Sequence, residues 1–168
     1  MKKEKFITVM AIFDESTQKV LQSIQEELEQ KYGVDTKTKD IPYHITLGSY
    51  AVEETEEIVS RIMDVAGKTK SFGVSFTGLN HFGNVVRFVE PVISEELSAL
   101  HMHFDSDYAN GFATWKPHAT VYRHSEPKEI EVSPSITDKL DRLSDAKIVG
   151  IELGEFFPAK RIVRVIFD

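Results

Sequence analysis

The sequence predicts an α+β protein with mostly antiparallel strands, folded as a single domain over residues 1–168. Its 168 residues suit one domain, and a chain of this length can bury a core without disulfide or metal support. The hydrophobic pattern alternates along the chain between the period of strands and the period of helices. The predicted order is strand, helix, strand, helix, hairpin, helix, strand and hairpin, which favours antiparallel pairing.

The first half contains two strands, each followed by an amphipathic helix. Residues 6–13 are rich in β-branched and aromatic side chains, which predicts a buried strand. Apolar residues then fall on one helical face over 15–31, and Gly33 is a suitable helix end. Residues 43–50 are predicted as a strand, and 53–66 as a helix whose acidic first turn suits the positive end of the helix dipole.

The second half is predicted to begin and end with a hairpin. Ser94 is the expected cap of a helix that ends at Gly111. The inner stripe of that helix is expected to be Leu97, Leu100, Phe104 and Tyr108. The other expected elements are a strand over 72–79, a turn at 80–83, a strand over 84–90, a strand over 118–123, a loop over 125–136, a helix over 135–143, and strands over 147–156 and 161–167.

Composition excludes several classes of function. There is no cysteine, which excludes a disulfide scaffold, a thiol nucleophile and an iron–sulfur cluster, and which fits a reducing compartment. The 27 acidic and 20 basic residues give a net charge of −7, which disfavours binding to a DNA duplex. No run is long and apolar enough to span a membrane, and no targeting segment is recognised. We therefore expect a cytoplasmic, monomeric protein.

Two short segments resemble each other and carry the chemistry. Both contain His-x-Thr followed by an aliphatic residue, just after a proline-containing approach and on a predicted strand. They are His44-Ile45-Thr46-Leu47 and His118-Ala119-Thr120-Val121. Because residues i and i+2 face the same side of a strand, each segment presents one imidazole and one hydroxyl together.

Paired imidazoles and hydroxyls suit the cleavage of a phosphodiester. One imidazole can take a proton from water while the other gives a proton to the departing oxygen. The hydroxyls of Thr46 and Thr120 can donate to phosphoryl oxygens. The structural alternative is that His44 and His118 are half-buried strand residues beside threonines that favour strands. A zinc site is the weaker interpretation, because threonine replaces the usual ligands.

At these motifs the sequence resembles the two-histidine (2H) phosphoesterase superfamily, which includes 2′-5′ RNA ligase-like proteins and cyclic phosphodiesterases. Residues 76–83 resemble the family's linking strand and turn, and 116–123 resemble its second motif with a trailing arginine. The resemblance implies a bilobed fold with two antiparallel sheets around a cleft, helices on the outer faces, and one His-x-Thr motif in each lobe. It also implies a reaction without metal or other cofactor.

The substrate implied is a small 2′,3′-cyclic nucleotide or an RNA 3′ end. By analogy with the family, His118 is the base and His44 the acid. The open alternatives are a 2′-5′ RNA ligase or RNA-end phosphodiesterase, and a nucleotide-binding module of the same fold without turnover.

Four further residues are candidates for substrate contact. In regular strands, Tyr50 shares the face of His44, and Tyr122 shares the face of His118. Phe82 lies on the predicted turn, where it can line the cleft mouth. Arg123 has the opposite parity from His118, so regular geometry favours a surface ion pair whereas the resemblance favours substrate binding.

Outside these candidates, we expect Arg87 to be a solvated charge. His101 and His103 are expected on the surface, and Trp115 in a structural position.

Overall fold

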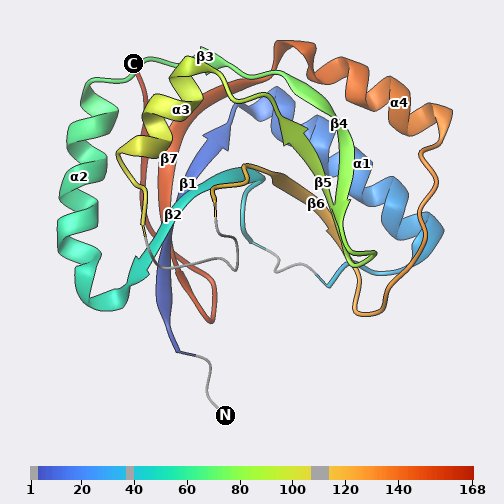
Figure 1. Ribbon diagram of the computed structural model, residues 1–168, viewed down its shortest axis with the longest axis horizontal. Helices are drawn as coiled ribbons and strands as arrows, with labels where there is room; N and C mark the ends of the chain where they lie inside the picture. Colours follow the sequence, from blue (N-terminus) through green and yellow to red (C-terminus); the bar gives the residue numbers. More distant parts are fainter. Residues whose placement is uncertain (1–3, 37–39, 107–113) are drawn as a thin grey trace.

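Two antiparallel sheets form the framework of the protein (Figure 1). The computed structural model describes residues 4–36, 40–106 and 114–168. The strands are β1 (Phe6–Phe13), β2 (His44–Ala51), β3 (Phe72–Gly73), β4 (Phe76–Phe82), β5 (Val86–Pro91), β6 (Ala119–Arg123), β7 (Lys147–Phe156) and β8 (Lys160–Ile166). The larger sheet has the order β2-β1-β7-β3, with β8 also paired to β7, and the smaller sheet has the order β4-β5-β6.

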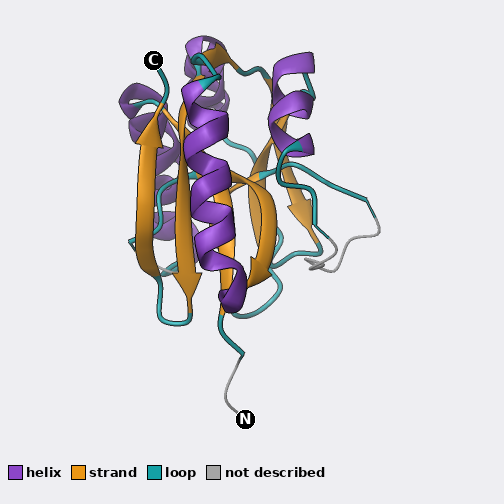
Figure 2. Cartoon of the chain, turned by 90° about the vertical axis from the view of Figure 1, so that its left-hand side faces the viewer, coloured by secondary structure: helices purple, strands orange, loops and turns teal. Residues whose placement is uncertain are grey.

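Helices cover the outer faces of both sheets, as predicted. The helices are α1 (Glu15–Tyr32), α2 (Thr55–Gly67), α3 (Glu95–Met102) and α4 (Pro134–Asp141), with short 3-10 helices at Val52–Glu54 and Arg142–Asp145. Helix α2 packs on β7 and β8 of the larger sheet, as seen from the side in Figure 2, whereas α1 packs on β6 of the smaller sheet. Helix α3 lies against β2. The two sheets are therefore enclosed from outside, with β2 and β6 brought together.

The helix boundaries follow local capping chemistry. The backbone N–H of Gly33 donates to Glu29 O at 2.9 Å, and Gly33 has a φ of +110°, a conformation that favours glycine. The hydroxyl of Ser94 accepts from the backbone N–H of Leu97 at 3.1 Å, which confirms the predicted cap of α3. Ser133 caps α4 in the same way.

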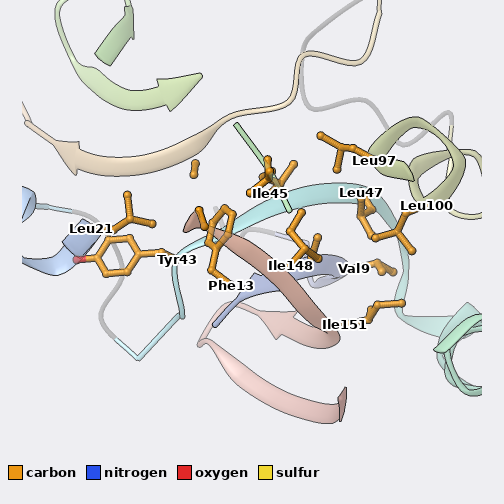
Figure 3. Close-up of a cluster of buried hydrophobic side chains, with 14 of the residues drawn as sticks. Val9, Phe13, Leu21, Tyr43, Ile45, Leu47, Leu97, Leu100, Ile148 and Ile151 are labelled. Carbon is orange, nitrogen blue, oxygen red and sulfur yellow. The ribbon is translucent and has the colours of Figure 1, made fainter. Parts of the chain in front are cut away.

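The core lies behind the cleft-facing strands. Strand β1 is central in the larger sheet and is buried along nearly its whole length. Figure 3 shows Ile45 and Leu47 of β2 packed among side chains of β1, β7 and α3. Burial of these aliphatic side chains fixes one face of β2, so the alternate residues must face the other way.

The predicted strand over 72–79 is wrong, because the chain changes sheets within it. Strand β3 pairs with β7 in the larger sheet, whereas β4 pairs with β5 in the smaller one. Between them, the backbone N–H of Val74 donates to Ala146 O at 2.9 Å, and Ser75 O accepts from Val92 N–H at 2.8 Å. Hydrophobic alternation continues through this crossing, so it gives no sign that the pairing partner changes.

The largest boundary differences from the prediction concern β4 and α3. Strand β4 continues through the expected turn to Phe82, because residues 80–82 pair with β5. Helix α3 ends at Met102, after which a turn buries Phe104 completely. Tyr108 and Gly111, which the sequence places in this helix, lie outside the described residues.

Two polar residues expected on the surface are shielded from solvent to different degrees, Arg87 being buried and His101 half-buried. Arg87 is only 5% exposed, and its Nη2 donates to Lys128 O at 2.8 Å, so it is not a solvated charge. The ring of His101 is stacked on Trp115 with a centroid separation of 3.8 Å. Aromatic stacking provides an apolar environment that the sequence spacing of His101 does not reveal. His103 is exposed, as predicted.

Within the described residues, no helix has both the length and the apolar character needed to cross a membrane.

Candidate active site

The two His-x-Thr motifs meet in one cavity between the sheets. Strand β2 is an edge strand of the larger sheet and β6 an edge strand of the smaller sheet, and the two strands lie against each other. His44, Thr46, His118 and Thr120 all line a cavity of about 410 Å³. The other lining residues are Phe6, Thr8, Ile41, Ser49, Phe82, Val86, Arg123, Phe156 and Phe157.

Strand alternation explains how each motif faces the cavity. In β2, Ile45 and Leu47 enter the core, which leaves His44 and Thr46 on the opposite face. In β6, Ala119 and Val121 are fully buried, and Thr120 is only half-buried between them. The aliphatic positions of the motif therefore anchor the strand, and the polar positions supply the cavity lining.

Both imidazoles are held by the same backbone contact. Nδ1 of His44 lies 2.7 Å from Pro42 O, and Nδ1 of His118 lies 2.7 Å from Lys116 O. A carbonyl oxygen only accepts hydrogen bonds, so Nδ1 is the donor in each pair. In the neutral ring, Nε2 is then the basic nitrogen, which gives both histidines the same tautomer.

The surroundings of His118 favour its neutral form. Its ring lies 4.9 Å from the ring centroid of Phe82 and 5.4 Å from that of Phe88. Burial lowers the pKa of His118, and the positive charge of Arg123 lowers it further, while the hydrogen bond to the Lys116 carbonyl acts in the opposite direction. An imidazole with a lowered pKa is unprotonated at neutral pH and can accept a proton.

A bulge follows the threonine in each motif and reverses the strand parity. In β2, Thr46 pairs with Met10 and Gly48 with Val9, so Leu47 is an extra residue. In β6, Val121 is the extra residue, because Phe88 pairs with Thr120 and Arg87 with Tyr122. Residues beyond each bulge therefore face the opposite side from the one that a regular strand would give them.

These bulges correct the prediction for the two tyrosines. Tyr50 lies in the core, where its hydroxyl donates to Phe104 O at 2.6 Å. Tyr122 is fully buried, and its hydroxyl donates to Gly33 O at 2.8 Å. Neither side chain lines the cavity, so both are core residues rather than cleft residues.

The same bulges bring Ser49 and Arg123 into the cavity. Sequence reasoning missed Ser49, although Gly48 beside it is a signal for a bulge in a strand. Arg123 lines the cavity despite its parity, and Phe82 lines it from the end of β4. The hydroxyls of Ser49 and Thr8 are 3.0 Å apart and form a hydrogen bond in the cavity wall.

One wall of the cavity is aromatic. Phe6 and Phe156 are stacked with a centroid separation of 5.4 Å, and the ring of Phe157 meets Phe6 edge-on at 6.0 Å. Sequence reasoning missed this wall, because Phe6 and Phe157 lie at opposite ends of the chain and converge only through the pairing of β1 with β7. A flat apolar group such as a nucleobase fits a wall of this kind.

The cavity lining carries little charge. Among its described residues there is no carboxylate, and Arg123 is the only side chain with a permanent charge. Across the part of the chain that the structure describes, no cluster of three or more His, Cys, Asp or Glu side chains is arranged to hold a metal ion. The donors that face the cavity are imidazoles, hydroxyls and the guanidinium of Arg123, which suit an anionic oxygen ligand better than a cation.

Two antiparallel sheets that bring paired His-x-Thr motifs to one cavity define the two-histidine phosphoesterase class of fold. The family model of the 2′-5′ RNA ligase superfamily matches the sequence over residues 13–149, and the chain belongs to that superfamily. The family resemblance predicted from the motifs is therefore confirmed. No match was found among curated proteins.

Solved structures agree on the fold. Escherichia coli LigT in apo form is similar with a TM-score of 0.61 and 13% sequence identity, over 98% of this chain and 99% of that one. A second structure, E. coli LigT complexed with NADP+, has a TM-score of 0.58 at the same identity and coverage. At this level of identity the similarity extends to the fold, and the activity must be argued from the cavity itself.

Proposed function

We propose that the protein is a metal-independent phosphodiesterase that hydrolyses the 2′,3′-cyclic phosphate of a nucleotide or a short RNA end. The observation that carries the proposal is the pair of identically held imidazoles that line one cavity, each with a threonine hydroxyl two residues along its strand. A single phosphorus between them has a proton acceptor on one side and a proton donor on the other.

The proposed step is in-line attack by water. His118 takes a proton from the water, and the new P–O bond forms as the bond from phosphorus to the 2′ or 3′ oxygen breaks. His44, in its protonated form, gives a proton to the departing oxygen, so the product is a nucleoside monophosphate. The lowered pKa of His118 supports its assignment as the base.

The remaining cavity residues hold the substrate in this proposal. Thr46 and Thr120 donate to the non-bridging oxygens, where negative charge increases in the transition state. Arg123 binds anionic substrate, and Phe82 limits the space beside the ring of His118. A nucleotide is the ligand class favoured by the aromatic wall and by described lining residues that include no carboxylate. One of the similar LigT structures holds the nucleotide NADP+.

The test is hydrolysis of a panel of 2′,3′-cyclic nucleotides by the wild type, His44→Ala and His118→Ala. We expect each substitution to lower turnover by about 100-fold or more, the lower range for loss of a general acid or base. His103→Ala is the matched control, because this histidine is exposed and does not line the cavity. Full activity in either cavity variant would refute the two-histidine mechanism.

The pH dependence gives a second test of the same proposal. One neutral and one protonated imidazole predict a bell-shaped profile of kcat/KM. Because the pKa of His118 is lowered from the ordinary histidine value of 6.5, this ring protonates only at a more acidic pH, so the acidic limb should lie below pH 6.5. A monotonic profile between about pH 5 and 9 would contradict the assignment.

Membership of the 2′-5′ RNA ligase superfamily favours a second candidate, the joining of RNA ends. In that reaction a 5′-hydroxyl replaces water as the attacking group on the cyclic phosphate, and the same two imidazoles move the protons. Incubation with oligonucleotides that carry a cyclic phosphate and a free 5′-hydroxyl separates ligation from hydrolysis. Binding of cyclic nucleotides with neither product formed would indicate a non-catalytic module.

A further inference from the structure

The two motifs share their geometry, but the cavity-facing residue beyond each bulge differs in charge. Both motifs have the histidine–carbonyl contact, the threonine and the bulge at the following aliphatic residue. Three residues beyond each threonine, the chain again faces the cavity, with Ser49 in one half and Arg123 in the other. The groups around a phosphorus at the centre are thus paired, whereas Arg123 has no counterpart of the same charge.

The environments of these two residues are also different. Ser49 is 1% exposed, and its hydroxyl is hydrogen-bonded to Thr8 in the wall. Arg123 is exposed, and its guanidinium makes no hydrogen bond or ion pair with any other residue that the structure describes. Its backbone is nevertheless fixed, because its N–H donates to Asp35 at 3.2 Å and its carbonyl accepts from Thr36 N–H at 2.8 Å.

The position of Arg123 along the strand sets it apart from the centre of the site. At about 3.3 Å per residue, its Cα lies roughly 10 Å or less from that of Thr120 along β6, on the side away from His118. The imidazoles and hydroxyls already supply two proton carriers and two donors to the reacting phosphate. The backbone of Arg123 is thus displaced along the strand while its charge still acts on His118, so its guanidinium fork can reach a second anionic group beside the reacting phosphate.

We propose that Arg123 binds a second, unreactive phosphate and so makes the enzyme selective for nucleoside 2′,3′-cyclic phosphates that also carry a 5′-phosphoryl group. That group is either a 5′-monophosphate or the phosphodiester that precedes the last nucleotide of an RNA. The inference rests on the proposed phosphodiesterase function and specifies its substrate. In a chain with a net charge of −7, a cavity whose described lining residues include one permanent cation and no carboxylate suits recognition of one such phosphate.

The experiment compares two substrates that differ only in the second phosphate. These are adenosine 2′,3′-cyclic phosphate and the same compound with a 5′-phosphate, assayed with the wild type, Arg123→Gln, Arg123→Lys and Arg142→Gln. The last is a matched control, because Arg142 is an exposed cation on a 3-10 helix outside the cavity. A dinucleotide that ends in a cyclic phosphate distinguishes a phosphodiester from a terminal phosphate.

We expect the wild type to prefer the 5′-phosphorylated substrate by about tenfold or more in kcat/KM, because one hydrogen bond between charged groups contributes a preference of about this size. Arg123→Gln should abolish this preference, mainly through KM, because the contact is made equally before and during the reaction. Arg123→Lys should retain part of it, and Arg142→Gln all of it. Added salt should weaken the preference, since the guanidinium is exposed.

Two results would overturn the inference. Equal wild-type activity on both substrates would show that no second phosphate is recognised, and an equal loss on both in Arg123→Gln would place the guanidinium on the reacting phosphate. If the wild type hydrolyses neither compound, the proposed function fails. Binding measurements then test separately whether Arg123 recognises a second phosphate. In that case adenosine 3′,5′-bisphosphate should still bind more tightly than 3′-AMP to the wild type and not to Arg123→Gln.

Discussion

Gly48 lies directly after the bulge of the first motif, and its substitution by alanine tests how closely this region is packed. A Cβ at Gly48 would lie 1.9 Å from Phe104 O and 3.1 Å from Phe104 C, which are backbone atoms. The carbonyl of Phe104 is held by the hydroxyl of Tyr50 at 2.6 Å, so it cannot turn away without breaking that hydrogen bond. Alanine therefore forces either β2 or the turn after α3 to move.

The size of the effect follows from two contributions. Overpacking of a core costs about 1–3 kcal/mol, and loss of a buried hydrogen bond adds about 1 kcal/mol. A total of about 2–4 kcal/mol corresponds to a fall in Tm of about 5–15 °C for a chain of this length. Because β2 carries His44 and Thr46 just before Gly48, turnover should fall as well, even at temperatures where the variant remains folded.

Thermal unfolding and cyclic nucleotide hydrolysis measure the two effects. Gly67→Ala is the matched control, because a Cβ at the last residue of α2 meets nothing within 4 Å. That variant should keep its activity and have an equal or slightly higher Tm, since alanine favours a helix over glycine. A Gly48→Ala protein with the Tm and turnover of the wild type would refute the packing described between β2 and the turn after α3.

Two further substitutions test contacts away from the reacting groups. Nε1 of Trp115 donates to Thr46 O at 2.9 Å and so connects the segment before the second motif with the first motif. Steady-state kinetics of Trp115→Phe should therefore show kcat lowered about tenfold with little change in KM. Hydrogen bonds from Ser135 and Lys139 lower the pKa of Glu27 from 4.5 to about 2, so its charge stabilises the fold above pH 4.5 and this stabilisation is lost toward pH 2. Glu27→Gln should therefore lower Tm at pH 7 by about 2–4 °C, and melting curves of the two proteins should converge near pH 2.

Much of the fold could be predicted from the sequence because its elements are long and strongly patterned. The period over 6–13 and 15–31 changes clearly from buried strand to amphipathic helix, and both elements form as expected. The segment 72–79 shows that hydrophobic periodicity does not identify which strands pair. Alternation indicates an extended chain, but pairing depends on distant strands, and here the partner changes from β7 to β5 within a few residues.

The candidate site could be predicted at its centre and not at its edges. His44 and Thr46 are two residues apart within a regular stretch, so their common face follows from strand geometry alone. Tyr50 and Tyr122 lie beyond a bulge, and one extra residue transfers every later side chain to the other face of the strand. The Phe104 carbonyl approaches Gly48 directly after the first bulge, and such a tertiary contact is not visible in a strand pattern.

The repeat between the motifs contains more information than either motif does alone. A bulge that follows the threonine in one strand is a local irregularity, but the same bulge after Thr120 places Arg123 where Ser49 stands in the other half. Once the register of β2 is known, the equivalent bulge in β6 explains why Arg123 faces the cavity, whereas regular alternation would place it on the other face. The histidines and threonines of the two motifs are the paired groups that a phosphate between them needs. Ser49 and Arg123 are the equivalent positions that differ in charge, so a substrate with a second phosphate can be recognised on the Arg123 side.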